Sequence, residues 1–499
     1  MLKRFPFYPI LCSIYPVVAL AAYNIDEISL KVALRPLAIT LFVFLFLFGL
    51  AQLFLRDWHK AALSTLLIIL FFFSYGHIYN LLEDVTVANV SIFRHRTLLP
   101  FLGIVLLVLL YIVRRIQRPA QFTFWLNLLS IYLMIYPISK IGYSVFRQSA
   151  AERSVQTSQS DIVASENRPD IYYIILDAYG REDVLRNMFG YDNKEFLNEL
   201  RQRGFYIAEC SQSNYGYTNF SLTSSLNYAY LDVLNVSNSR ADRIALLKQG
   251  AVRVFLEEQG YKTVAFPTGF VFTEWEDADL YLDFDRPVST LDEFEVLALN
   301  TTLFRAMYDL KIVDTGEVTH KDMRRLRVLS VLEKLQQLPR MDGNLFVFAH
   351  IGVPHRPYTF GPNGEIPDYD GKMATQEETG KAYIDQVKFI SNETLKVVDA
   401  LLENSEVPPI ILIQGDHGPQ EDLTENPSNR MPILNAYYLP GVNMDKVLYP
   451  DISPVNSFRV VLNSYFGQNL PILEDRSYYA PNDERTDFEL VQNSCPGKH

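Results

Sequence analysis

The stretch Ile410-Ile411-Leu412-Ile413-Gln414-Gly415-Asp416-His417-Gly418 predicts the fold and points to its functional edge. Its four leading apolar residues predict a strand that is buried on both faces, as in a parallel sheet. The two glycines end the strand, so Asp416 and His417 follow at its carboxyl end. Ligands of open α/β sheets bind at this end of the strands, where a carboxylate beside an imidazole suits a divalent metal. An isolated Asp-His pair, however, is more often an ordinary polar turn.

Two other predicted strands end in similar residues. The strand 171–176 runs into Asp177, and the strand 345–349 runs into His350, with His355 shortly after it. Strand ends of a parallel sheet lie on one edge, and three of the five histidines beyond residue 168 belong to this set. A joint metal and anion site is therefore favoured over separate structural roles. The side chains expected to converge are Asp177, His350, His355, Asp416 and His417.

The region from residue 169 to residue 499 alternates between predicted strands and helices. The further helices are expected at 194–203, 246–259, 323–338 and 382–404, and the further strands at 262–266 and 435–439. This alternation predicts an α/β domain with a mostly parallel sheet flanked by helices.

The first 147 residues are strongly apolar and predict a bundle of five transmembrane helices. The apolar runs are 7–23, 34–55, 61–82, 97–113 and 122–146, each long enough for a hydrocarbon core of about 30 Å. The predicted organisation is a transmembrane anchor at 1–147, a linker rich in Ser, Gln, Ala and Glu at 148–168, and a catalytic domain at 169–499.

Basic residues orient the anchor. With the N-terminus in the cytoplasm, the cytoplasmic loops carry Arg56, Lys60, Arg114, Arg115 and Arg118, against Lys31, Arg35, Arg94 and Arg96 outside. The excess of inside charge is modest, but Lys3 and Arg4 agree with it. Five spans then place residues 169–499 on the periplasmic or extracellular side of a cell (inner) membrane.

Charge and cysteine usage exclude several classes of protein. The formal net charge of −12 argues against a nucleic-acid partner. The chain has three cysteines and no CxxC spacing, which argues against a zinc ribbon. Cys210 and Cys495 pair if the large domain is extracytoplasmic, or remain two free thiols, and the sequence leaves both alternatives open.

A candidate nucleophile lies in the stretch 213–227, where a glycine-containing turn leads into a helix start rich in Ser and Thr. Amides at a helix N-terminus attract an anion, and a metal-bound hydroxyl can attack it. Spacing alone does not choose among Thr218, Ser221 and Thr223. The plain alternative is an N-cap followed by a packing face of small residues.

Together these stretches resemble the alkaline phosphatase and sulfatase superfamily, over roughly residues 168–467. The resemblance is closest to its membrane-anchored branch, which includes lipoteichoic acid synthases and lipid A phosphoethanolamine transferases. The motifs that carry it are 169–181, 213–227, Ala349-His350 with Pro354-His355, Gly415-Asp416-His417-Gly418, and 454–459.

The resemblance implies a role for each position. Asp177, Asp416 and His417 match metal ligands, and Thr218 matches a nucleophile that also touches the metal. His350 and His355 resemble histidines that bind the substrate or leaving group. The implied cofactor is one divalent metal, Mn²⁺ or Zn²⁺ rather than Ca²⁺ or Mg²⁺.

Some positions depart from the superfamily pattern. A sulfatase has a Cys or Ser that becomes formylglycine and a following Arg, whereas this chain has Thr218 and no such Arg. Ala178 also replaces the second acid of sulfatases.

We therefore expect a metal-dependent phosphotransferase that acts on a phosphodiester, with a membrane lipid or envelope glycan as substrate. The transferred group would be phosphoethanolamine or phosphoglycerol. The alternatives are a hydrolase of phosphoric or sulfuric esters and a non-catalytic envelope binding protein.

Overall fold

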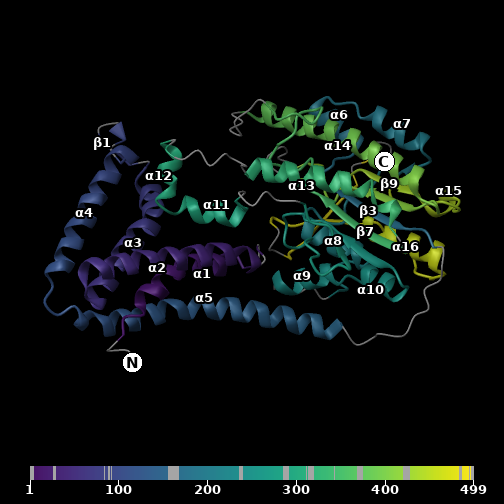
Figure 1. Ribbon diagram of the computed structural model, residues 1–499. Helices are drawn as coiled ribbons and strands as arrows, with labels where there is room; N and C mark the ends of the chain where they lie inside the picture. Colours follow the sequence, from purple (N-terminus) through teal and green to yellow (C-terminus); the bar gives the residue numbers. More distant parts are fainter. Residues whose placement is uncertain are drawn as a thin grey trace. The chain divides into compact units, whose positions relative to one another are not determined.

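The computed structural model describes residues 5–25, 28, 30–83, 85–87, 90–91, 93–155, 168–234, 240–284, 291–310, 312, 320–341, 343–367, 375–419, 427–482, 486–493 and 495. The chain forms two compact units (Figure 1). Unit 1 comprises Met1–Phe146 with Arg286–His320, and unit 2 comprises Arg147–Asp285 with Lys321–His499.

Unit 1 has a helix at each of the five predicted positions. These are α1 (Tyr8–Tyr23), α2 (Leu34–Leu55), α3 (Trp58–Leu82), α4 (His95–Arg115) and α5 (Ala120–Val155). A short 3₁₀ turn, η1 (Leu30–Ala33), precedes α2, and a two-stranded ribbon, β1 (Thr86–Val87) with β2 (Val90–Ser91), precedes α4.

The expected number of five spans needs a correction. Among the described residues, four helices are long and apolar enough to cross a membrane, and α1 is a shorter apolar helix. Its 16 residues extend about 24 Å at 1.5 Å per residue, which falls short of a core of about 30 Å. Helix α5 continues to Val155, into the region where we expected the linker, and residues 156–167 lie outside the described residues.

Unit 1 also includes a later segment that the sequence does not single out. This segment carries α11 (Glu293–Asn300) and α12 (Phe304–Asp309). The Gly76 amide of α3 donates to the Thr301 carbonyl (3.1 Å), and the Leu303 amide donates to the Phe72 carbonyl (2.9 Å). A Cβ on Gly76 would lie 2.5 Å from the Asn300 carbonyl oxygen. Glycine at this position therefore lets the segment approach the backbone of α3.

Unit 2 is built on a seven-stranded, mostly parallel sheet in the order β4-β9-β8-β3-β7-β5-β6. Its strands are β3 (Ile171–Leu176), β4 (Tyr206–Ile207), β5 (Lys262–Ala265), β6 (Leu280–Tyr281), β7 (Leu345–Ile351), β8 (Ile410–Gln414) and β9 (Asn435–Tyr438). Strands β8, β3, β7, β5 and β6 run parallel, and β9 pairs antiparallel with β8 and with β4. The predicted class of fold is confirmed. The C-terminal region adds a ribbon of β10 (Ser477–Tyr479) and β11 (Glu489–Val491).

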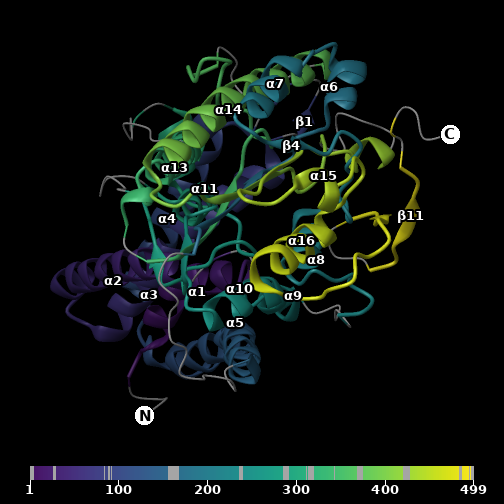
Figure 2. The same cartoon turned by 90° about the vertical axis from the view of Figure 1, so that its right-hand side faces the viewer.

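Helices cover both faces of this sheet (Figures 1 and 2). The helices of unit 2 are α6 (Glu182–Phe189), α7 (Lys194–Gln202), α8 (Thr218–Leu226), α9 (Arg240–Lys248), α10 (Ala251–Glu258), α13 (His320–Leu335), α14 (Gln376–Asn404), α15 (Met444–Val447) and α16 (Pro454–Phe466), with 3₁₀ turns η2 (Leu338–Arg340) and η4 (Pro427–Arg430). Alternate residues of β3 enter opposite cores. Tyr172 and Ile174 pack with side chains of α7, α13 and α14, whereas Tyr173 and Ile175 pack with α8, α10 and α16. Both faces of the central strand are buried for this reason.

One predicted helix is wrong in its extent. Residues 246–259 form the end of α9 and the separate helix α10, divided at Gly250. A Cβ on Gly250 would lie 3.0 Å from the Leu226 carbonyl oxygen. The chain therefore turns at this glycine, where its backbone passes close to the end of α8.

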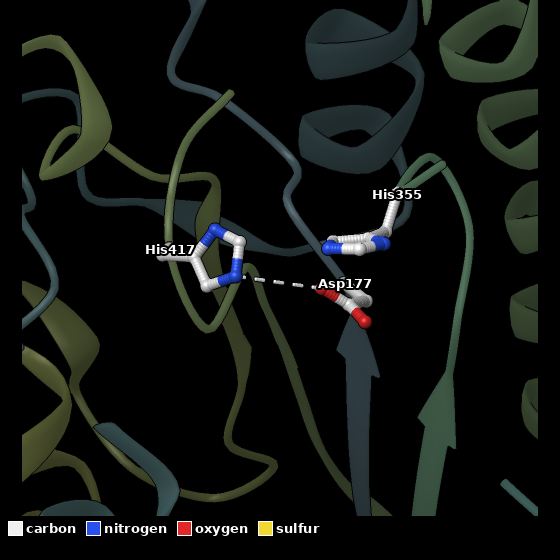
Figure 3. Close-up of side chains that lie close together, drawn as sticks. All are labelled: Asp177, His355 and His417. Carbon is white, nitrogen blue, oxygen red and sulfur yellow. Dashed lines mark ion pairs between the residues drawn. The ribbon is translucent and has the colours of Figure 1, made fainter. Parts of the chain in front are cut away.

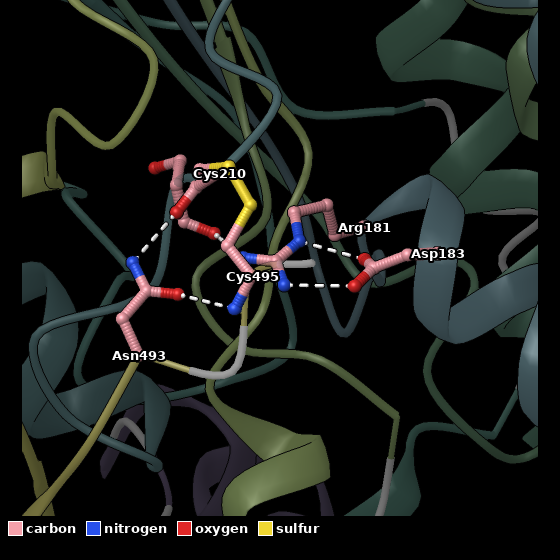
Figure 4. The surroundings of a disulfide bond; sticks show 6 residues. Arg181, Asp183, Cys210, Asn493 and Cys495 are labelled. Atoms are coloured by element: carbon pink, nitrogen blue, oxygen red, sulfur yellow. Dashed lines mark hydrogen bonds and ion pairs between the residues drawn. A yellow bond between two sulfur atoms is a disulfide. The ribbon is translucent and has the colours of Figure 1, made fainter. Parts of the chain in front are cut away.

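Cys210 and Cys495 form a disulfide across 285 residues, with their Cα atoms 5.3 Å apart (Figure 4). Asn493 supports this bond, because its side chain donates to the Cys210 carbonyl (2.9 Å) and accepts from the Cys495 amide (3.0 Å). The pairing that the sequence left open is thus present in the structure.

Candidate metal centre

The site is built around Asp177, which follows the central strand β3. Its amide donates to the Ile351 carbonyl (3.0 Å), which holds the first residue beyond β3 beside the end of β7. The chain then turns at Ala178, which has a φ of 65°. The Ala178 amide donates to Asp416 Oδ1 (3.0 Å). The strand-end acid is thus fixed beside the end of β8.

Asp416 and His417 reach the same point from β8, and both are almost completely buried. Gly415 permits this approach, since a Cβ there would lie 2.5 Å from the Tyr179 carbonyl oxygen. The His417 Nδ1 donates to the Gly418 carbonyl (2.8 Å), and this fixes the tautomer. Its Nε2 is therefore left as an acceptor, 3.6 Å from Asp177 Oδ1 and 3.6 Å from Asp416 Oδ2.

The two remaining histidines complete the cluster. His350 lies on β7 in register with Ile175, and its Nε2 is 3.5 Å from Asp177 Oδ2. His355 lies on the loop after β7, where its amide donates to the Asp177 carbonyl (2.9 Å) and its Nδ1 donates to the Arg356 carbonyl (2.6 Å). Figure 3 shows the His417 ring to the left of the Asp177 carboxylate, joined to it by the ion-pair line, and the His355 ring above the carboxylate. All five predicted strand-end side chains thus come together.

The structure also distinguishes the candidate hydroxyl groups. Thr218 is the first residue of α8, and its side chain lies beside the Asp416 carboxyl, where it opposes the rise in the pKa of that group. Ser221 Oγ instead contacts Ser213 Oγ (3.0 Å), and Thr223 Oγ1 donates to the Asn219 carbonyl one turn earlier (2.5 Å). Among these three residues, Thr218 is the one placed at the carboxylates.

Burial and neighbouring charges set the protonation of the cluster. Burial raises the pKa of Asp177, but His355, His350 and His417 outweigh this effect and hold the pKa far below its usual range. Burial, followed by the charge of Asp177, raises the pKa of Asp416 to about 6.

The histidines respond in different directions. Burial, with the charge of Arg430, lowers the pKa of His417 to about 3, so this ring is neutral. Burial also lowers the pKa of His355. Burial acts in the same direction on His350, but the contact with Asp177 and its charge outweigh burial and raise the pKa of this ring.

These residues fit a divalent metal. Within the described residues, three buried atoms at this point have no hydrogen-bond partner: Asp177 Oδ1, Asp416 Oδ2 and His350 Nε2. Two overlapping groups bring their ligand atoms within 4.8 Å of one another, namely Asp177 with His355 and His417, and Asp177 with His350 and Asp416. Ligand atoms of a tetrahedral metal at about 2.1 Å stand about 3.4 Å apart. The measured separations of 3.5–3.6 Å are close to this value.

The sequence missed the residues that orient the histidines. Thr273 Oγ1 contacts His350 Nδ1 (2.8 Å) and is fully buried. Gln386 of α14 donates from Nε2 to the Pro354 carbonyl (3.0 Å) and to the His355 carbonyl (3.2 Å). The sequence offered one signal for these residues, because Gln386 is a polar residue within the apolar pattern of α14.

No protein-family model and no curated protein matches the chain. Among solved structures, it resembles the zinc complex of the C-terminal periplasmic domain of EcEptC from Escherichia coli, with 14% identity, 66% of this chain and 94% of that chain covered, and a TM-score of 0.43.

Two other solved structures illustrate the range of similar proteins. The integral membrane protein lipooligosaccharide phosphoethanolamine transferase A from Neisseria meningitidis covers 92% of this chain and 95% of its own, with 13% identity and a TM-score of 0.41. A 2-O GAG sulfatase covers 61% and 72%, with 14% identity and a TM-score of 0.38. The solved structures that resemble this chain thus include phosphoethanolamine transferases and a sulfatase.

Proposed function

We propose that this chain is a membrane-bound, metal-dependent phosphotransferase that uses Thr218 as the nucleophile on a phosphodiester. The observation that carries the proposal is the set of three buried, unpartnered atoms of Asp177, Asp416 and His350 beside the Thr218 side chain. Buried carboxylate atoms without a partner are costly, and a cation removes that cost. A protein that only binds a glycan or a partner has no need for such a cluster.

One Mn²⁺ or Zn²⁺ would be held by Asp177, Asp416, His417 and Thr218. A bound ion of this kind lowers the pKa of a coordinated hydroxyl. The neutral His417 ring, with Nε2 directed at both carboxylates, suits this role. The first amides of α8 lie beside Thr218 and would hold the oxygens of a phosphoryl group.

The reaction consists of two displacements at phosphorus. The Thr218 oxygen forms a bond to phosphorus, and the bond from phosphorus to the leaving alcohol breaks. His350 or His355 supplies the proton that this alcohol takes. An acceptor alcohol then attacks the same phosphorus and passes its proton to that histidine, and the Thr218 oxygen leaves. Water in place of the acceptor would give a hydrolase.

The anchor suggests the substrate class and the side of the membrane. A catalytic unit attached to membrane-crossing helices can reach a lipid headgroup or an envelope glycan, and transfer of phosphoethanolamine or phosphoglycerol fits the sequence resemblance. Arg56, Lys60 and the arginines at 114, 115 and 118 lie at the α2–α3 and α4–α5 connections, and cytoplasmic positions for these two connections place the catalytic unit outside. The Cys210–Cys495 disulfide supports an extracytoplasmic location.

Mass mapping of the peptide that contains Thr218 tests this proposal. The full chain would be incubated with Mn²⁺ or Zn²⁺ and native membrane lipids and then quenched with acid. We expect an adduct on Thr218 whose mass identifies the transferred group. Thr218→Ala should abolish turnover while it retains the fold. The matched control is Thr223→Ala, because that hydroxyl lies in the same helix and bonds only within it in the described contacts; this variant should remain active.

The other outcomes discriminate between the alternatives. Product release that needs no acceptor alcohol would identify a hydrolase. A Thr218→Ala variant with wild-type turnover would refute the threonine nucleophile. Protein that binds neither metal and carries no adduct would favour the non-catalytic binding protein.

A further inference from the structure

Unit 1 contains an apolar cavity of about 320 Å³ that is separate from the residues of the metal centre. Its walls come from α1, α2, α3 and α11, and every lining residue belongs to unit 1. The α2 wall is one helical face, with Pro36, Ile39, Thr40, Val43, Phe44 and Leu47 at spacings of three and four residues. This volume lies at the lower end of the range for ligand pockets, about 300–1,000 Å³.

The wall of the cavity consists mostly of hydrocarbon side chains. Three polar side chains, those of Thr40, Glu295 and Thr302, occur among its lining residues. The Glu295 carboxylate is bound by Arg35 of α2 and accepts from the Asp292 amide (3.0 Å). Thr302 Oγ1 donates to the Leu299 carbonyl (2.7 Å). Apolar cavities of this kind exclude water and bind apolar ligands.

The wall formed by α11 is held firmly in place. Its N-terminus has a capping box between Asp292 and Glu295. Phe294 is buried in a cluster with Val17 and Ala33. The Thr301 and Leu303 backbone bonds to α3 fix the other end of the helix. Since protein interiors are normally close-packed, an apolar space between such fixed walls is suited to an occupant.

The lipid bilayer would supply the occupant, because the cavity borders the exposed face of α2. Two lining residues of α2 remain exposed, Ile39 to 56% and Val43 to 44%. Only 6% of the most apolar window of this membrane-crossing helix is buried. In a membrane, the molecules that contact such a surface are lipid hydrocarbon chains.

We propose that this cavity binds one hydrocarbon chain of a membrane phospholipid, which enters past Ile39 and Val43 on α2 and reaches α11. The Arg35–Glu295 ion pair marks the polar end of the site. Occupancy does not depend on the phosphotransferase reaction, so either proposal can fail without the other.

Photolabelling of the full chain in lipid nanodiscs tests the proposal. The discs would contain phosphatidylethanolamine and phosphatidylglycerol, with a trace of phosphatidylcholine that carries a diazirine at the end of an acyl chain. The readout is the adduct on the peptide that contains α11, since eight residues are too few to cross a membrane. The lipid-facing residues of α4, such as Leu107 (67% exposed), serve as the internal standard.

Two tryptophan variants make the test specific. Ala298 lines the cavity, whereas the adjacent Leu297 does not and is 43% exposed. Ala298→Trp should reduce the α11 adduct about tenfold because a filled cavity cannot hold a chain, whereas Leu297→Trp should label as the wild type. Val43→Trp fills the cavity from the opposite wall and replaces Ala298→Trp if that variant fails to fold. No α11 adduct in the wild type, or an adduct at the wild-type level in a folded cavity-filling variant, would overturn the proposal.

Discussion

Replacing Gln386 with methionine should impair the reaction through the position of His355. Gln386 is completely buried on α14. Its Nε2 bonds to the Pro354 and His355 carbonyls, and its Oε1 accepts from the Thr359 amide (2.8 Å). These bonds hold the loop that carries the His355 ring into the site.

The structure sets the size of this effect. Methionine fills a similar volume but leaves the Thr359 amide and the Pro354 carbonyl without the side-chain partner, while the His355 carbonyl keeps Arg324 Nη2 (2.8 Å). Each of these two orphaned buried groups costs about 1–3 kcal/mol, so we expect a loss of about 2–6 kcal/mol in the free energy of unfolding. A displacement of about 1 Å at a reacting group can reduce the rate about 100-fold.

The assay compares two phosphodiesters, one with an alkyl and one with a p-nitrophenyl leaving group. If His355 protonates the leaving group, Gln386→Met should lower the alkyl rate about 100-fold and change the p-nitrophenyl rate far less, because p-nitrophenolate leaves without a proton. Ser391→Ala is the matched control. It removes a buried bond of α14 to Tyr179 (2.6 Å), away from His355, and should not separate the two rates. Equal losses on both substrates, or full alkyl activity in a destabilised Gln386→Met, would refute the reasoning.

Three further predictions concern the metal, the disulfide and the α11–α12 segment. A proton competes with the metal for Asp416, whose pKa is raised to about 6. Metal affinity measured by chelator competition should therefore fall about tenfold per pH unit below pH 6; affinity that stays constant down to pH 4 would contradict this. Reduction of the disulfide, or a double Cys210→Ser, Cys495→Ser variant, should lower stability by about 2–4 kcal/mol, measured as the Tm with and without reductant. The double variant is the control, since reductant should leave its Tm unchanged. Gly76→Ala places a Cβ against the Asn300 carbonyl and should cost about 1–3 kcal/mol. Faster amide hydrogen exchange at residues 300–303 of this variant in nanodiscs would show the destabilisation. Unchanged exchange there would contradict the close contact between Gly76 and Asn300.

The sequence by itself determined the class of fold and the strand ends. Hydrophobic runs and their bounding glycines are local signals, and the alternation of strands and helices predicts a parallel sheet. Asp177, His350 and Asp416 could be placed on one edge because the carboxyl ends of parallel strands share that edge. The apolar runs of the first 147 residues equally predicted helices for a membrane.

The tertiary structure alone decided which distant groups meet. Thr218, rather than Ser221, reaches Asp416 because α8 starts at the edge of the sheet, and the hydroxyl that faces this edge depends on how the helix packs. The roles of Gln386 and Thr273, the docking of the α11–α12 segment on α3, and the Cys210–Cys495 bond join residues that are tens to hundreds of positions apart. The periodicity of a sequence does not predict such pairings, because they arise when whole elements pack against one another. Buried polar groups then need partners from whichever elements lie beside them.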